Sequence, residues 1–384
     1  MSGFGFSEAQ EMFRKEVRSF VQQEIAPLAK QLLKLDQTPP ELLKKVASRG
    51  LTGINLPEKY GGQQADWVSL GIAVEEISKV DIVLGLYPIY PILVSLALLN
   101  YGSEQLQEEF IPPLIAGEIQ TCHALTEPDA GSDAAAIKTK AIKRDDYYVL
   151  NGEKTAVSVG TRADIALVFA KTDVKAGARG TSCFLVPLNL PGISRSRFED
   201  MGMERLGRAS ITFEDVKLPK RYLLGSEGQG FYMTMGVFDF MRVCIGIACL
   251  GVAQASLEDA MTYARQRVAF GKPIAKFEGV SFKIVENATV VEAARLLCYR
   301  TLWLKDQGQV HTKESAMCKW WSVQVAVRAI HDALLIHGHI GYSKEYPLEQ
   351  RLRDTIGFEI GDGTAEIMKI IICRELLGKE FLPY

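Results

Sequence analysis

The sequence predicts a mainly α-helical protein with a β domain in the middle of the chain. Apolar residues recur at helical spacing over residues 7–118, and helical spacing returns over residues 230–384. Between them, residues 119–229 hold short apolar runs punctuated by glycine and proline, which is the pattern of strands. We therefore expect three domains: an N-terminal helical domain (1–118), a central β domain (119–229) and a C-terminal helical domain (230–384).

Start signals mark two helices of the first domain. Ser7 precedes an acidic first turn and an apolar stripe, so it is predicted to cap a helix. The pair Pro39-Pro40 predicts a second helix start, because proline is tolerated in a first turn. Residues 56–62 are expected to form a loop, and residues 68–79 a third helix.

One stretch, residues 82–99, carries no charge over a length close to that of a membrane span. It also contains Gly85, Pro88 and Pro91, which interrupt a continuous helix. We therefore expect a buried pair of helices with a break at proline, and no membrane span.

The strands expected in the central domain are short. The first runs over residues 147–150 and enters a tight turn at Asn151-Gly152. Three more are predicted over residues 165–171, 181–187 and 211–216. In the C-terminal domain, four long apolar-faced segments suggest an antiparallel four-helix bundle, at residues 238–266, 279–307, 313–338 and 363–377.

Composition narrows the functional classes. The chain of 384 residues has a formal net charge of −2, which gives no indication of a nucleic-acid partner. Its seven cysteines are odd in number and form no C-x-x-C pair, so we expect buried free thiols in a reducing compartment. The N-terminus lacks a basic segment followed by an apolar core, and a cytoplasmic location is therefore expected.

The most specific segment is Ala-Leu-Thr-Glu-Pro-Asp-Ala-Gly-Ser-Asp at residues 124–133. By itself it is a loop of turn-forming residues that could hold a flavin edge or a phosphate, or be merely solvated. Five further motifs follow it: Asn151–Lys154, Ile211–Pro219, Gly228–Phe231, Arg267–Pro273 and Gly361–Ile367. In this order and spacing, and over essentially the whole chain, the motifs resemble the acyl-CoA dehydrogenase family.

The resemblance implies the fold of that family, which has an N-terminal helical domain, a β-barrel-like middle domain and a C-terminal four-helix bundle. It also implies an acyl-CoA substrate and a non-covalent FAD, bound between the β domain and the bundle and partly across a subunit interface. A homotetramer and an electron-transfer flavoprotein as electron acceptor are expected on the same ground.

Residue roles follow from the resemblance where the motifs match. Ser158 stands where a hydroxyl residue hydrogen-bonds flavin N5. The other expected FAD contacts are Leu125, Thr126, Gly131 and Ser132 in the flavin loop, Thr364 and Glu366 after the catalytic loop, and Arg267 and Phe270 toward a neighbouring subunit. Substrate contacts are expected from Ser132, Asp239, Arg242 and Gly363, although Arg242 could instead form a salt bridge at the end of the bundle.

Several positions depart from the family pattern. Ala156 stands where a tryptophan often packs on the flavin, and Glu278 stands where a glutamine often contacts FAD. The glutamine-x-x-glycine-glycine stretch appears as residues 335–339, beginning with Leu335 and ending with His339. The two histidines of this stretch have no accompanying carboxylate cluster, so no metal site is predicted.

Dehydrogenation of a thioester needs a carboxylate that removes the α proton. Most family members place a glutamate just before a glycine-threonine pair, and here that residue is Asp362. A second family branch carries its glutamate at the position of Met241, which cannot accept a proton. Asp362 is therefore the predicted base, and the alternative is that it only caps a helix starting at Gly363.

Aspartate is one methylene shorter than glutamate, and Ala156 leaves room beside the flavin. Both features favour an alicyclic or branched substrate such as cyclohexanecarboxyl-CoA, with a straight short-chain acyl-CoA as the alternative. An acyl-CoA oxidase is disfavoured because oxidases of this superfamily are usually much longer. A flavin-binding protein without catalysis and an enzyme working in the reductive direction remain open alternatives.

Overall fold

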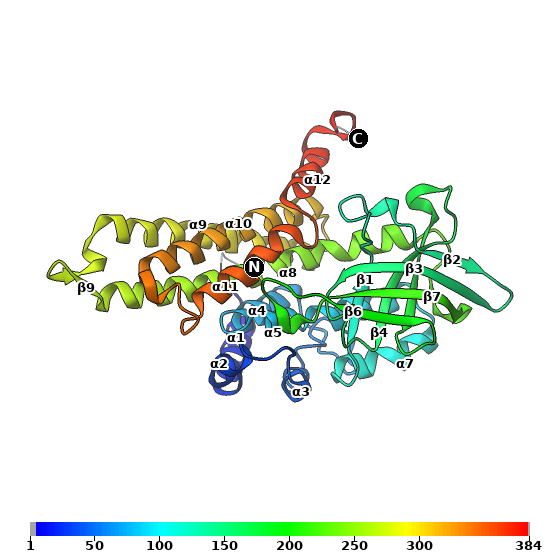
Figure 1. The fold of residues 1–384 in the computed structure, drawn as a ribbon, viewed down its shortest axis with the longest axis horizontal. Coiled ribbons are helices and arrows are strands. Elements are labelled where there is room, and N and C mark those ends of the chain that lie inside the picture. The colour runs from blue at the N-terminus through cyan, green and yellow to red at the C-terminus, as the bar shows by residue number, and fades with distance from the viewer. Residues whose placement is uncertain (1–4, 383–384) are drawn as a thin grey trace.

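The computed structural model describes residues 5–382, so the first four residues, where a targeting segment was considered, lie outside it. Figure 1 shows helices packed against one another in one half of the molecule and a twisted β-sheet in the other. The long helix α8 (Gly230–Gln266) runs from the edge of the sheet through the helical half. Elements of all three sequence regions therefore meet around the N-terminal part of α8.

The N-terminal region is helical, as predicted. Ser7 caps the first helix: its hydroxyl accepts the Gln10 amide at 3.2 Å, and the Gln10 side chain accepts the Ser7 amide at 2.9 Å. The second predicted start is also confirmed, since a helix begins at Pro40. The α-helices are α1 (Glu8–Phe20), α2 (Ala29–Leu32), α3 (Pro40–Ser48), α4 (Trp67–Ser78), α5 (Ile82–Leu86), α6 (Ile89–Tyr101) and α7 (Glu104–Ile115).

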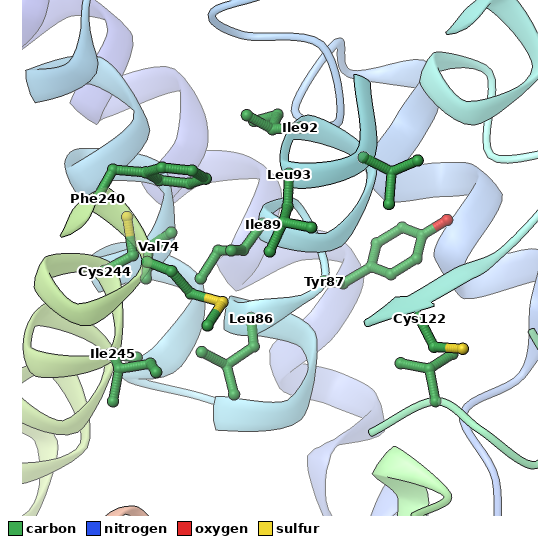
Figure 2. Packing of buried hydrophobic residues seen from close by; sticks show 14 of the residues in the cluster. Val74, Leu86, Tyr87, Ile89, Ile92, Leu93, Cys122, Phe240, Cys244 and Ile245 are labelled. Carbon is green, nitrogen blue, oxygen red and sulfur yellow. The ribbon is translucent and has the colours of Figure 1, made fainter. Parts of the chain in front are cut away.

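The uncharged stretch forms the two helices α5 and α6, which break at Tyr87 and Pro88. By length and composition alone, the segment 82–101 and helix α8 could each cross a membrane. Their most apolar windows are 83% and 72% buried inside the protein, as expected of core helices. Figure 2 shows Leu86, Ile89 and Leu93 packed toward Phe240 and Cys244 of α8.

The middle region forms one sheet of eight strands in the order β6-β7-β3-β2-β4-β5-β8, with β1 added beside β4. The path of hydrogen-bonded strands is open, with β6 and β8 at its two ends. Four short or polar strands were not predicted from the sequence: β1, β2, β6 and β8. The strands are β1 (Thr121–Ala124), β2 (Lys140–Lys143), β3 (Tyr147–Val157), β4 (Ile165–Lys171), β5 (Thr181–Pro187), β6 (Ile193–Arg197), β7 (Ala209–Pro219) and β8 (Leu223–Leu224).

The tight turn expected at Asn151-Gly152 is wrong, because β3 continues through these residues to Val157. The register with β7 shifts between Leu150 and Gly152, so the glycine marks a bulge rather than a hairpin. A Cβ atom on Gly152 would lie 2.5 Å from the Thr139 hydroxyl and 2.7 Å from its Cα. The glycine is required by a close backbone approach inside the sheet.

The C-terminal region departs from the predicted four helices. Helix α8 starts at Gly230 rather than at 238, and a fifth helix, α11 (Leu348–Ile360), was missed because it is short and largely polar. The last helix starts at Ala365 rather than at Gly363. The remaining helices are α9 (Glu278–Asp306), α10 (Thr312–His337) and α12 (Ala365–Leu377), and a hairpin of β9 (Val268–Ala269) and β10 (Lys272–Pro273) joins α8 to α9.

The cysteines behave as expected. Six of the seven are buried and Cys373 is half-buried, and all seven are free thiols. Burial raises the pKa of the Cys122 thiol to about 12, so it stays protonated at neutral pH. The six buried cysteines are therefore core residues.

Candidate active site

Asp362 lies in the turn between α11 and α12, with its backbone in the left-handed region at φ 57°. The helix that follows is capped by Thr364, whose hydroxyl accepts the Ile367 amide at 3.4 Å. The alternative role of Asp362 as a helix cap is therefore wrong. Its carboxylate is left available for another interaction.

The Asp362 side chain is accessible to solvent but has many protein atoms close to it. The side chain itself is exposed, yet enough protein atoms surround it to weaken its solvation. This desolvation raises the pKa of the carboxyl group, while the charges of Lys319 and Arg242 oppose the shift. The result is a carboxylate whose proton affinity is increased, but which still has two cations nearby.

A residue that sequence reasoning missed, Tyr90, also lies at this place. It sits in the first turn of α6, and its hydroxyl faces both Asp362 and Ser158. Burial raises the pKa of Tyr90, the charge of Asp362 raises it further, and a hydrogen bond with Ser158 opposes the shift. The three side chains come from three different regions of the sequence, and Tyr90 lies near both the predicted N5 hydroxyl and the predicted base.

The backbone around Ser158 is unusual. Ala156 and Val159 have φ values of 54° and 63°, in the left-handed region that side chains rarely adopt. The register between β3 and β7 shifts between Lys154 and Val157, so the strand bulges at Ala156. Bulges and strained residues of this kind are over-represented beside active sites, where they re-aim side chains.

The predicted flavin loop follows β1 directly. Leu125 is buried, Thr126 is half-buried, and Gly131 and Ser132 are exposed. In the described part of the chain, no atom lies within 4 Å of where a Cβ atom on Gly131 would stand, so the loop faces open space. The Thr126 carbonyl accepts the amide of Thr155 at 2.8 Å, which ties the loop to the strand that leads to Ser158.

A buried ion pair fixes the same loop from below. The Lys154 ammonium is fully buried and donates to the Leu125 carbonyl at 2.9 Å and to the Glu127 carboxylate at 2.7 Å. Glu127 also accepts the backbone amides of Lys138 at 2.5 Å and Thr139 at 2.9 Å. Burial lowers the pKa of Lys154 to about 8, despite the nearby carboxylate.

Asp239 and Arg242 lie one turn apart on α8. Their charged atoms are 3.6 Å apart, and Asp239 also accepts the Thr312 hydroxyl at 2.6 Å. Arg242 is 5% exposed, and among the described residues its Nε has no hydrogen-bond partner. The ion pair considered for Arg242 is therefore present, but it leaves a buried donor for a further acceptor.

The remaining predicted contacts lie at the opposite end of the bundle. Phe270 is 95% exposed at the tip of the β9–β10 hairpin, far from the sheet (Figure 1). His337 stacks on Tyr263 with ring centroids 4.5 Å apart, which places the C-terminus of α10 at that same end. The residues found there are Arg267, Phe270, Glu278, Leu335 and His339, all of them exposed. Within one subunit they cannot reach Ser158.

Thr364 and Glu366 stand beside Asp362, as the motif requires, with Glu366 exposed in the first turn of α12. Over residues 5–382, no group of three or more histidine, cysteine, aspartate or glutamate side chains could hold a metal ion. The arrangement thus brings together an exposed loop, a strained strand end and a carboxylate.

These residues fit a flavin dinucleotide. The exposed loop at Gly131 and Ser132 offers backbone amides and a hydroxyl. The distal group of exposed residues around Phe270 forms a second, separate surface at the other end of the bundle.

Comparison with known proteins agrees with this geometry. Three family models match: the N-terminal domain of acyl-CoA dehydrogenase over residues 7–118, its middle domain over 122–216 and its C-terminal domain over 228–377. An acyl-CoA dehydrogenase of Bacillus subtilis is 40% identical, covering 97% of this chain and 99% of its own. The CarC subunit of the caffeyl-CoA reductase–Etf complex of Acetobacterium woodii is 38% identical, covering 97% and 100%.

Solved structures agree as well. The structure of butyryl-CoA dehydrogenase from Megasphaera elsdenii superposes with a TM-score of 0.94 at 35% identity, covering 98% of this chain and 100% of its own. An FAD complex of PigA superposes with a TM-score of 0.94 at 28% identity, covering 98% and 99%. The chain belongs to the acyl-CoA dehydrogenase family, and it is an oxidoreductase of that family. The reaction type of this family is the FAD-dependent dehydrogenation of an acyl-CoA thioester.

Proposed function

We propose that this chain removes the α proton of its acyl-CoA substrate with Asp362. The observation that carries the proposal is the placement of this carboxylate. It projects from a left-handed turn, it caps no helix, and the protein packed around it raises its pKa above the ordinary value of an aspartate. A desolvated carboxylate of this kind is a stronger base than a solvated one, which suits a weakly acidic proton. The bound FAD would supply the acceptor for the hydride that leaves the β carbon.

The chain's own residues would hold that cofactor and orient the substrate. Leu125, Thr126, Gly131 and Ser132 would line the flavin, with Ser158 presenting its hydroxyl to the reacting edge. Arg242 would offer its unpaired Nε–H to an acceptor on the CoA arm, since Asp239 satisfies its charge only in part. Tyr90, between Ser158 and Asp362, would border the acyl group.

We further propose that the functional unit is a homotetramer. The exposed residues around Phe270 could contact FAD only in a neighbouring subunit, because they lie at the far end of the bundle (Figure 1). Helix α12 supports the same proposal, since Met368 is its only buried residue and Leu376 and Leu377 are 59% and 62% exposed. Light scattering should give the mass of four chains, and a stable monomer that binds FAD fully would contradict the assembly.

For the substrate we propose an alicyclic or branched acyl-CoA such as cyclohexanecarboxyl-CoA. The short Asp362 arm and the space left by Ala156 both favour a substrate that is bulky at the reacting carbons. A straight short-chain acyl-CoA is the alternative, and the butyryl-CoA dehydrogenase structure favours it by similarity. Work in the reductive direction is a further alternative, which the relative named as a caffeyl-CoA reductase subunit supports.

The test is anaerobic flavin reduction with a panel of thioesters. We expect cyclohexanecarboxyl-CoA to bleach the flavin with a higher kcat/KM than butyryl-CoA. A preference for butyryl-CoA would favour a straight short-chain acyl-CoA as the substrate. If no thioester reduced the flavin, the result would favour a flavoprotein without this activity. Reoxidation should then need an electron-transfer flavoprotein, and rapid reoxidation by NAD alone would contradict that partner.

A further inference from the structure

A buried lysine holds the turn that carries Asp362. Lys319, on α10, is 1% exposed, and its ammonium donates to the Phe358 carbonyl at 2.7 Å and to the Gly363 carbonyl. One of these acceptors lies four residues before Asp362 and the other directly follows it. The lysine therefore ties both sides of the turn to a single point on the bundle.

The backbone of this turn needs such support. Asp362 and Gly363 have φ values of 57° and 102°, and a left-handed conformation is unfavourable for a residue with a side chain. The Phe358 carbonyl belongs to the last turn of α11, where carbonyl groups lack partners within the helix. The Lys319 ammonium satisfies this acceptor and fixes the position at which the helix ends.

The same ammonium acts on the carboxylate through its charge. Among the groups that face Asp362, Lys319 opposes the effect of burial most, followed by Arg242 on α8. Tyr90 faces it from α6 as a neutral phenol. Lys319 in turn faces Asp362, the Cys249 thiol, Arg242 and Glu359, and burial lowers its own pKa to about 8. It is thus mostly charged at neutral pH, and loses that charge in mildly alkaline solution.

We propose that Lys319 is a positioning residue for this reaction: it holds Asp362 in its reactive turn and places a positive charge behind the carboxylate. The inference rests on the proposed role of Asp362 as the base. Lys319 itself does not touch substrate, because it is buried behind the turn.

The test is the pH dependence of anaerobic flavin reduction at saturating substrate, compared between wild type and two variants. Lys319→Gln keeps an amide donor for one carbonyl but removes the charge, and Lys319→Met removes both. An opposite charge at close range lowers a carboxyl pKa by about 1–3 units. Both variants should therefore shift the acid limb of the profile upward by about 1–2 units, because the base must be ionised to react.

The two functions of the lysine are separable in the plateau above the acid limb. Lys319→Gln should retain more of the plateau rate than Lys319→Met, because the amide still restrains the turn. Lys171→Met is the matched control: it removes another buried lysine that binds a backbone carbonyl, Ala135 at 2.9 Å, but in the middle domain. Its acid limb should coincide with that of wild type.

An acid limb at the wild-type pH in Lys319→Gln, in protein that is folded and loaded with FAD, would overturn the inference. If neither neutral variant folds, Lys319→Arg decides the question, because it keeps the charge and should keep the limb within a few tenths of a unit. A large shift in that variant would contradict the charge role. Asp362→Asn separates the two proposals. If this variant reduces flavin at the normal rate, the assignment of Asp362 as the base fails. If Asp362→Asn is inactive but the acid limb of Lys319→Gln stays at the wild-type pH, only the role of Lys319 is rejected.

Discussion

The buried ion pair below the flavin loop offers a prediction that needs no substrate. Lys154→Met removes the ammonium that binds the Leu125 carbonyl and the Glu127 carboxylate. Methionine has a similar volume, so the change leaves no large cavity. What remains is a buried carboxylate without its counter-ion, directly under the loop that we propose to hold FAD.

The free-energy cost of Lys154→Met depends on the hydrogen bonds that Glu127 keeps in the variant. Breaking a buried pair by removing one partner costs about 3–5 kcal/mol. Because Glu127 keeps the amides of Lys138 and Thr139, we expect a cost near the lower end, about 3 kcal/mol. If the loop opens while the rest of the sheet stays folded, this cost reduces FAD affinity by about 100-fold.

Fluorescence titration of the apoprotein with FAD measures this loss, and urea denaturation shows whether the fold shares it. The double variant Lys154→Met/Glu127→Gln also removes the unpaired charge, and should recover at least about 1 kcal/mol. Wild-type affinity in Lys154→Met, or a double variant weaker than the single one, would refute the reasoning.

Two further predictions concern stability. Burial raises the pKa of Asp354 to about 6, so its contribution to the free energy of unfolding is complete below its unfolded pKa of about 4 and is lost as the pH rises through 6. In urea unfolding, the stability of Asp354→Asn relative to wild type should therefore rise by about 2–3 kcal/mol between pH 4 and 7. A difference in stability that stays constant over this range would contradict the prediction. Gly152→Ala should destabilise the sheet by about 2 kcal/mol or more, because the new Cβ atom would collide with Thr139. The control Gly177→Ala, which has open space around it at φ 56°, should cost only about 1 kcal/mol. Equal losses of stability in thermal denaturation would show that the close approach of the Thr139 backbone to residue 152 does not determine the cost.

Most of the architecture could be predicted because long helices carry strong periodic signals. The failures share a physical cause. Strand β6 is a polar edge strand with four of its five residues exposed, so no alternation of buried residues marks it. Helix α11 buries only four residues, two of them polar. The turn expected at Gly152 failed because glycine also serves where two backbones approach closely, and only the fold shows which backbone is near.

The predicted site shows a similar division. Asp362 could be found because its motif is contiguous. Tyr90 could not, since it stands in an apolar run and comes near Ser158 and Asp362 only when the chain folds. Lys319 has the spacing of an ordinary helix lysine, and nothing in the local sequence reveals that its ammonium is buried.

The central claim is that Asp362 removes the α proton, and stopped-flow flavin reduction of Asp362→Asn tests it most directly. The amide preserves the volume and does not disturb the helix cap, which Thr364 provides. We predict a variant that binds FAD and acyl-CoA normally but is reduced about 10²–10⁴-fold more slowly, the usual contribution of a general base. Asp362→Glu should remain active and raise the rate with butyryl-CoA relative to cyclohexanecarboxyl-CoA. Reduction of Asp362→Asn at a rate near that of wild type would contradict the claim, because another group would then have to take the proton.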